Sequence, residues 1–236
     1  MTKNGILLEE RSVVIPGETL AKGMDYLPGH GTHRVKEEVR SSLIGLLDVK
    51  GSVLKIIPLK GVYIPKEGDK VIGQVTEISH NSWNIEINAP LTGNMYIAEA
   101  SKSYIESDAD LSRYYDVGDY VYAEVISVGR DNFSKLRMKN RMFKKLEPGL
   151  IIKVSPVKVP RLIGKRGSMV KTLKEKTNCS LIVGQNGLIW VKGKKREDEL
   201  LAAKAIKYVE RNAHLSGLTE AVKQKIGEWK NGKNKK

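Results

Sequence analysis

A short loop in the last third of the chain combines two glycines, three positions apart, with two cations between them. Its residues are Gly164, Lys165, Arg166 and Gly167, with Ile163 before the loop and Ser168 after it. Because glycine has no Cβ atom, such a backbone can come close to a ligand. If a helix begins after the second glycine, its free N–H groups and its dipole favour an anion, and the loop cations add to that attraction. The loop therefore predicts a site for the phosphates of a nucleic acid.

The spacing alone is weak evidence for such a site. The chain holds 22 glycines among 236 residues, so chance gives about two pairs with this spacing, and it has two. The second pair, Gly184 and Gly187, falls between two apolar runs and predicts a hairpin turn, which the Asn186-Gly187 dipeptide favours. The first pair falls between two helical stretches, where the alternative is a plain connector with exposed basic side chains.

The elements expected around the loop follow a recognisable order. They are a strand at 150–154, a short helix opened by Pro160, a helix at 168–177, strands at 181–184 and 188–192, and a helix at 196–213. Strand–helix–helix–strand–strand–helix is the order of a KH domain, a module that clamps about four nucleotides of single-stranded RNA. Residues 223–236 contain six lysines and are expected to form a basic tail that frays at its end.

The preceding residues predict β structure. Residues 66–147 contain five strand-like runs, at Lys70–Ile78, Trp83–Asn88, Asn94–Ile97, Tyr120–Val128 and Lys135–Lys139, which fit a small closed barrel of the OB kind. Shorter β runs, separated by glycine and proline, fill the residues before them. The expected fold is multidomain, mainly β followed by α+β: an N-terminal β domain (1–65), a five-stranded OB barrel (66–147) and a C-terminal KH domain with its tail (148–236).

Positive charge is concentrated where the loop lies. Residues 1–150 hold 20 basic and 20 acidic side chains, whereas residues 151–236 hold 21 basic and 7 acidic ones, so the last third carries the net charge of +14. Such a field attracts a polyanion, and nucleic acid is the commonest one in the cytosol. The alternative is a lysine-rich surface that only keeps the protein soluble.

The composition also bounds the compartment. No apolar run approaches the roughly 18 residues that a membrane span needs. The first residues carry acids and only a short apolar stretch, so no signal peptide is expected. The single cysteine, Cys179, excludes an intramolecular disulfide and a multi-cysteine zinc site, and is expected to be a small buried residue. These features predict a cytoplasmic protein with no membrane partner.

The other reactive side chains do not form a catalytic pattern. His30 and His33 could ligate a metal, but no carboxylate or cysteine cluster accompanies them. Two pairs of aspartates could be mistaken for the carboxylates of a two-metal nuclease, yet they fall in turns, where aspartate is favoured by local hydrogen bonds. They are Asp108/Asp110 and Asp116/Asp119. The sequence predicts no catalytic residues, no metal and no cofactor.

Several motifs resemble those of a known family. Gly68-Asp69-Lys70-Val71 and Gly118-Asp119-Tyr120-Val121 resemble the repeated G-D-x-V signatures of the ribosomal-protein-type OB module that binds RNA. This module, followed directly by the KH-like part, resembles the KH-containing RNA-binding cap subunit of the exosome, in its archaeal version. Val14-Ile15-Pro16-Gly17 and Tyr63-Ile64-Pro65 also look like that family, so the resemblance spans nearly the whole chain. A related cap subunit that ends in a zinc ribbon is excluded by the single cysteine.

The resemblance implies partners and a division of labour. The N-terminal β domain would dock on a ring of phosphorolytic exosome subunits, with three copies around the pore. Their OB and KH modules would recruit single-stranded RNA and pass its 3′ end inward. Catalysis would belong to the ring, so the chain itself is not expected to be an enzyme.

The OB module departs from the family pattern. Aromatic residues that usually stack on bases are replaced by Asn81 and Asn84, and the histidine common after the third strand is replaced by a tyrosine. Stacking is worth about 1–3 kcal/mol per base, so this surface is expected to be a weaker guide for RNA. Its expected contacts are Tyr96, Lys135 and Arg137, the alternative being an ordinary solvated barrel face. Trp83 alternates with two isoleucines and is expected in the barrel core.

Two other functions stay open at this point. The same modules could belong to a free RNA-binding factor in translation or ribosome assembly, whose N-terminal domain would engage no ring subunit. The chain could also be a stand-alone RNA-degrading or RNA-processing enzyme, against which the missing catalytic constellation argues. Polynucleotide phosphorylase carries both modules, but with KH before OB and after a catalytic core that this sequence lacks.

Overall fold

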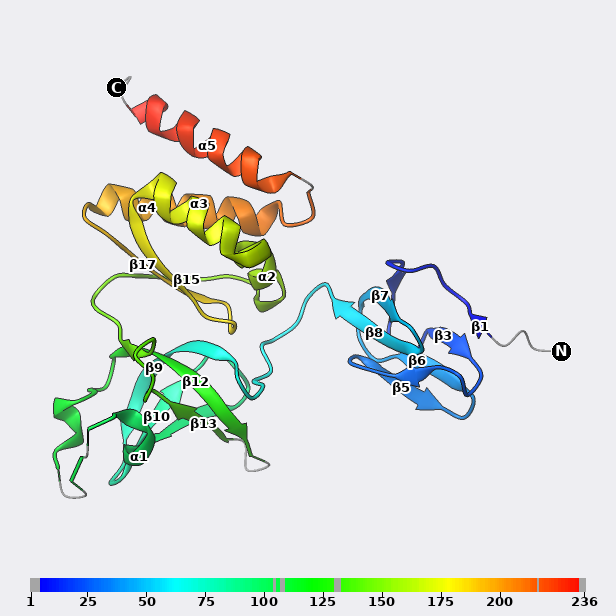
Figure 1. The fold of residues 1–236 in the computed structure, drawn as a ribbon, viewed down its shortest axis with the longest axis horizontal. Coiled ribbons are helices and arrows are strands. Elements are labelled where there is room, and N and C mark those ends of the chain that lie inside the picture. The colour runs from blue at the N-terminus through cyan, green and yellow to red at the C-terminus, as the bar shows by residue number, and fades with distance from the viewer. Residues whose placement is uncertain (1–4, 104, 107–108, 130–132, 216, 234–236) are drawn as a thin grey trace. The chain divides into compact units, whose positions relative to one another are not determined.

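The structure is a computed structural model that describes residues 5–103, 105–106, 109–129, 133–215 and 217–233. It divides into two compact units, Met1–Gly61 and Val62–Lys236 (Figure 1). The first unit is made of strands, and the second joins a barrel to a mixed α+β module. The domain boundaries expected at 65/66 and 147/148 stay predictions.

The first unit consists of two four-stranded sheets. One has the order β1-β3-β6-β5 and the other the order β2-β7-β8-β4. The strands are β1 (Gly5–Ile6), β2 (Val13–Val14), β3 (Thr19–Lys22), β4 (Leu27–Pro28), β5 (Thr32–Val35), β6 (Glu38–Ser41), β7 (Gly45–Lys50) and β8 (Val53–Pro58). Side chains from both sheets, including Leu20, Leu47 and Leu54, are fully buried in one small core. The expected N-terminal β region is confirmed.

The second unit begins with the five-stranded barrel that the sequence predicts. Its strands are β9 (Lys70–Ile78), β10 (Ser82–Glu86), β11 (Thr92–Tyr96), β12 (Tyr120–Val128) and β13 (Phe133–Arg137), with the short β14 (Lys144–Lys145), α1 (Ile97–Ala100) and a 3₁₀ turn (Leu111–Arg113) beside them. The order is β13-β11-β10-β9-β12, and β13 also pairs with β12, so the sheet closes on itself. Trp83 is fully buried, and its indole N–H donates to the Tyr115 carbonyl oxygen at 2.9 Å, which confirms its place in the core.

The following elements form the predicted KH fold. They are β15 (Leu150–Lys153), α2 (Val159–Ile163), α3 (Ser168–Thr177), β16 (Cys179–Val183), β17 (Leu188–Gly193) and α4 (Arg196–Arg211), with 3₁₀ turns at Pro156–Lys158 and Lys165–Gly167. The three strands form an antiparallel sheet in the order β15-β17-β16. Helices α3 and α4 cover one face of this sheet (Figure 1). Cys179 is buried, as expected.

The C-terminal residues correct one expectation. Instead of a basic tail, Leu218–Lys233 form helix α5, which packs against α3 and α4 (Figure 1). Leu218, Val222 and Ile226 are buried because residues four apart lie on the same side of a helix. Trp229 extends this row and packs edge-on against an aromatic ring of α4. The expected tail was wrong for residues 223–233, because lysines on the exposed side of a helix are compatible with apolar residues buried on its other side. Residues 234–236 lie outside the described range.

Both faces of the KH sheet are buried. Toward the helices, alternate side chains such as Ile189 and Val191 join the KH core. On the opposite face, Ile182 and Trp190 pack with the barrel core, and the Trp190 indole N–H donates to the Glu147 carbonyl oxygen at 2.8 Å. Because successive side chains of a strand point to opposite faces, one sheet serves two cores. The barrel and the KH module are therefore packed as one unit.

The β16–β17 turn fastens this contact. Asn186 is fully buried, and its amide group donates to the carbonyl oxygens of Ile72 at 2.6 Å and Ile87 at 2.7 Å, both in the barrel. Its Oδ1 accepts from the Ile72 N–H at 3.3 Å, and its own carbonyl oxygen accepts from the Asn88 side chain at 2.8 Å. Buried backbone groups need such partners. The predicted hairpin turn is confirmed, and it also joins the two modules.

We expect Asn186→Ala to lower the free energy of unfolding of the second unit by about 3 kcal/mol, because two buried carbonyl oxygens lose their donor. All three tryptophans lie in this unit, so urea unfolding followed by tryptophan fluorescence measures it selectively. Asn81→Ala is the matched control, since that side chain is exposed. A loss no greater than that of the control would contradict the role of the turn.

Candidate nucleic-acid interface

The loop between α2 and α3 places its two glycines in different surroundings. Both have positive φ, +73° at Gly164 and +78° at Gly167, which glycine adopts without strain. A Cβ on Gly164 would lie 2.8 Å from the Met169 nitrogen, whereas one on Gly167 would meet nothing within 4 Å. Gly164 is therefore needed to pack the loop on α3, and Gly167 leaves the outer side of the loop open to a ligand.

The charges of the loop are free to meet an anion. Lys165 and Arg166 are exposed, and within the described ranges neither forms an ion pair. Helix α3 begins at the exposed Ser168, with no side-chain cap and no acidic residue in its first turn. The Ser168 N–H donates to the Lys165 carbonyl oxygen, so at this helix end the positive end of the dipole and the two exposed cations attract an anion.

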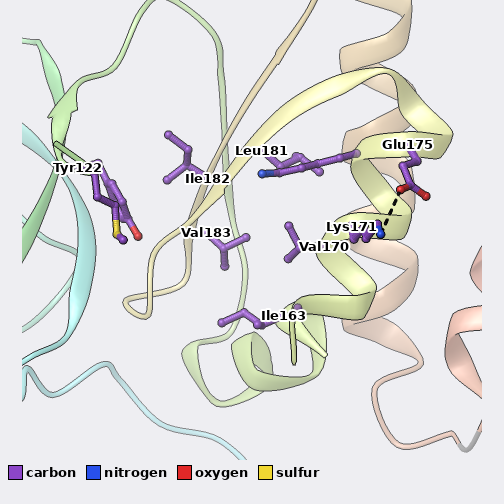
Figure 2. Close-up of a pocket in the computed structure, with 11 residues that line it drawn as sticks. Tyr122, Ile163, Val170, Lys171, Glu175, Leu181, Ile182 and Val183 are labelled. Atoms are coloured by element: carbon purple, nitrogen blue, oxygen red, sulfur yellow. Dashed lines mark ion pairs between the residues drawn. The ribbon is translucent and has the colours of Figure 1, made fainter. Parts of the chain in front are cut away.

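A groove of about 690 Å³ runs beside the loop. Its apolar lining includes Ile163, Val170, Leu181, Ile182 and Val183, and its edge carries Lys171, Lys174 and Glu175. Figure 2 shows Tyr122 on the side opposite Lys171, with β16 between them. The ion pair between Lys171 and Glu175 is long, 3.9 Å, and exposed, so it holds the lysine weakly. An apolar groove with a positive edge fits bases inside and phosphates outside.

The structure gathers the six predicted loop residues at this groove. Ile163 and Gly167 line it, and the other four complete the loop next to it. Sequence reasoning missed Tyr122 and Met142, which the barrel contributes to the groove. No local signal marks them, because they are far from the loop in the sequence. Burial raises the pKa of the Tyr122 phenol.

The predicted barrel contacts come together only in part. Tyr96 ends β11, is 41% exposed, and lies beside β13, where the Lys135 Nζ is 6.0 Å from the centre of its ring. Arg137 instead forms an ion pair with Glu124 at 3.2 Å. Tyr96 and Lys135 thus present an aromatic ring and a cation side by side, whereas the charge of Arg137 is already matched.

A network of polar side chains occupies the barrel face around Asn84, where the sequence has asparagine instead of the aromatic residues usual in the family. The Asn94 amide donates to Asn84 Oδ1 at 2.9 Å, and the Asn84 amide donates to the Glu77 carboxylate at 2.8 Å. A carboxylate at this place disfavours phosphate. Sequence reasoning also missed Phe133, which is 42% exposed and shares a face of β13 with Lys135, two positions on. The alternation of residue types along β13, in which Phe133 and Lys135 share one face, is a sequence signal that predicts this exposure.

The residues considered for metal binding have ordinary roles. In the part of the chain that the structure describes, no three His, Cys, Asp or Glu side chains gather to hold a metal ion. His33 lies within hydrogen-bond distance of a serine hydroxyl, 2.7 Å away. Asp110 and Asp119 accept from backbone N–H groups of their own turns at 3.1 and 2.7 Å, as expected, and Asp108 lies outside the described residues. No described helix is long and apolar enough to cross a membrane.

The fold and the loop place this chain among proteins that join an OB barrel of the S1 type to a KH module. Three family models match it: "Exosome RNA binding protein RRP4 N-terminal domain" at residues 11–60, "RRP4, S1 domain" at 62–127 and "KH domain" at 149–197. A crystal structure described as that of an exosome complex RNA-binding protein superimposes with a TM-score of 0.66 and 31% identity, covering 73% of this chain and 99% of that one.

Curated relatives agree. The exosome complex component Rrp4 of Methanobrevibacter smithii is 42% identical over 94% of this chain and 72% of its own length. The component of the same name from Methanothermus fervidus is 39% identical over 94% of this chain and 97% of its own length, and that from Thermococcus kodakarensis is 40% identical over 93% and 86%. The chain belongs to the Rrp4 family of exosome complex components.

The two glycines of the loop should differ in their effect on stability. We expect Gly164→Ala to cost about 3 kcal/mol, since the new Cβ would overlap the start of α3 in a conformation that favours glycine. Gly167→Ala should cost only about 1 kcal/mol, the strain of a left-handed backbone in open space. Urea unfolding followed by tryptophan fluorescence measures both, and equal losses would show that the loop is not packed as described.

Proposed function

We propose that this protein is a non-catalytic RNA-binding subunit of the exosome. Three copies cap a ring of phosphorolytic subunits, recruit single-stranded RNA and guide its 3′ end into the pore. RNA recruitment is best supported by two exposed cations, Lys165 and Arg166, which have no ion pair within the described residues. They lie at the uncapped start of α3, next to an apolar groove. Membership of the Rrp4 family supports the assembly.

In this proposal the KH groove provides most of the RNA affinity. Phosphates meet Lys165 and Arg166 near the positive end of the α3 dipole, while the bases lie against the apolar lining. Because the phosphate contacts release counterions, the affinity falls steeply with salt. The barrel, through Tyr96 and Lys135, adds a weaker contact, since Glu77 and the ion-paired Arg137 leave little free positive charge there.

Gly167→Asp tests the loop. The variant places a carboxylate where a phosphate is expected, and we expect at least a tenfold loss of affinity for a labelled single-stranded RNA in fluorescence anisotropy. Its Cβ would meet nothing, and aspartate tolerates the left-handed conformation better than most residues, so the fold should persist.

Gly51→Asp is the matched control for this variant. Gly51 also has a positive φ, +60°, and an added Cβ would meet nothing within 4 Å, but this glycine lies in the first unit. The control should bind RNA like the parent protein. A folded Gly167→Asp variant with unchanged affinity would remove the loop from the RNA site.

The first unit offers a surface suited to a protein partner. Antiparallel pairing sets Val13 beside Leu46 and Leu46 beside Ile57 on one face of the β2-β7-β8-β4 sheet. Ile15, Ile44 and Leu59 lie one residue beyond the ends of β2, β7 and β8 and are exposed as well. We call these six residues, Val13, Leu46, Ile57, Ile15, Ile44 and Leu59, the outer apolar face. Val13 is 61% and Ile57 48% exposed. Contiguous exposed apolar side chains mark interaction sites.

We assign this outer apolar face to the ring contact. The same residues fall within the part of the chain that matches the Rrp4 N-terminal family model, residues 11–60. Acidic and basic side chains of the first unit balance more closely than those of the KH module, so RNA is a poor occupant of this face. An apolar surface of a ring subunit is the occupant that the proposed assembly supplies.

Ile57→Glu tests the docking. We expect the variant to fold, because the side chain is half exposed, and to lose co-purification with phosphorolytic ring subunits from a native lysate treated with nuclease. RNA affinity should stay unchanged. Met24→Glu, at a methionine that is 68% exposed in the same unit, is the control and should retain the ring.

The same pull-down separates the proposed function from its rival. If the parent protein recovers a nuclease-resistant complex with ring subunits, the exosome assignment stands. If it recovers only RNA, or ribosomal proteins that nuclease releases, the chain is a free RNA-binding factor.

A further inference from the structure

The groove beside the KH loop has a wall that the KH module does not supply. Tyr122 of β12 and Met142, in the turn between β13 and β14, line it together with residues of α2, α3 and β16. Figure 2 shows Tyr122 facing the β16 residues Ile182 and Val183 from the side away from α3. The groove is thus closed by the barrel.

The turn that carries Met142 is held firmly. The Phe143 side chain is buried, and its ring packs against that of Tyr122 with centroids 5.3 Å apart. The Phe143 N–H donates to the Asn140 carbonyl oxygen at 3.0 Å, which closes the turn. Directly afterwards, Lys144 pairs with Tyr122 in the β12–β14 ladder. Met142 is therefore presented from a fixed backbone.

The side chain of Met142 suits a nucleobase. It is 50% exposed although it borders an apolar groove, so part of its thioether surface is uncovered. Methionine sulfur makes favourable contacts with aromatic rings and adapts its shape to them. Lys171 and Lys174 of α3 line the same groove and are positively charged.

We propose that Met142 is a contact residue of the RNA site, which is therefore a composite of the KH module and the barrel. Its side chain packs on one base in the groove, and Tyr122 and Phe143 position it. The proposal rests on the proposed function, because it requires single-stranded RNA in this groove. It adds a base contact from outside the KH fold.

A walk of abasic sites through the RNA tests this contact. The full chain and its Met142→Ala variant are titrated, by fluorescence anisotropy, with a labelled single-stranded octanucleotide and with eight versions that each lack one base. We expect Met142→Ala to bind the intact RNA about fivefold more weakly. At one position of the RNA, removing the base should lower the affinity of the parent protein but should have little further effect on the affinity of the variant. Such non-additivity marks a direct contact.

Three comparisons make the result decisive. Met142→Leu keeps the apolar bulk and should restore most of the affinity, whereas Met24→Ala, at an exposed methionine of the first unit, should change nothing. Suppose that Gly167→Asp weakens RNA binding, but that Met142→Ala either has no effect or lowers the affinity for every abasic RNA by the same factor. The composite site is then wrong and the KH site stands. If neither variant changes binding, the groove is not the RNA site and the proposed function fails with it.

Discussion

The barrel and the KH module depend on the sheet that they share. A three-stranded sheet covered by helices on one side alone would leave Ile151, Ile182 and Trp190 in water, an apolar patch of the kind that soluble proteins rarely expose. The barrel covers that face, and Asn186 supplies the donors that the Ile72 and Ile87 carbonyl oxygens need once water is excluded. Burial of apolar side chains stabilises the contact between the two modules, and the hydrogen bonds of the Asn186 amide determine how the two modules align.

The shared sheet also determines the shape of the groove. Strand β16 forms the groove floor with Leu181 and Val183, while Ile182, between them, is anchored in the barrel core. The floor cannot move toward or away from α3 without disturbing both cores, because packed interiors resist such shifts. A groove held in this way loses little conformational freedom when a ligand binds, and a preorganised site binds more tightly for the same contacts.

Features that depend on residues close together in the sequence could be predicted, and features that depend on residues far apart in the sequence could not. The loop at 164–167, the barrel strand Lys70–Ile78 and the Asn186-Gly187 turn are encoded by neighbouring residues, and the structure has all three. Helix α5 is also encoded locally, by the spacing of Leu218, Val222 and Ile226, although the lysines of the same segment favour a basic tail. The places of Met142 and the Asn186 side chain could not be predicted, because each depends on how a barrel and a sheet, distant in sequence, pack together.

The distribution of charge explains why one chain can serve two kinds of partner. The last third carries the excess of basic side chains, and there the groove is apolar inside and positive at its edge. RNA, with charged phosphates and flat bases, matches both properties at once. The outer face of the first unit is apolar and its charges are more nearly balanced, so it gains more from a protein surface than from a polyanion. The proposed division of labour therefore rests on different forces, of which only the first is screened by salt, and the two contacts should respond independently to ionic strength.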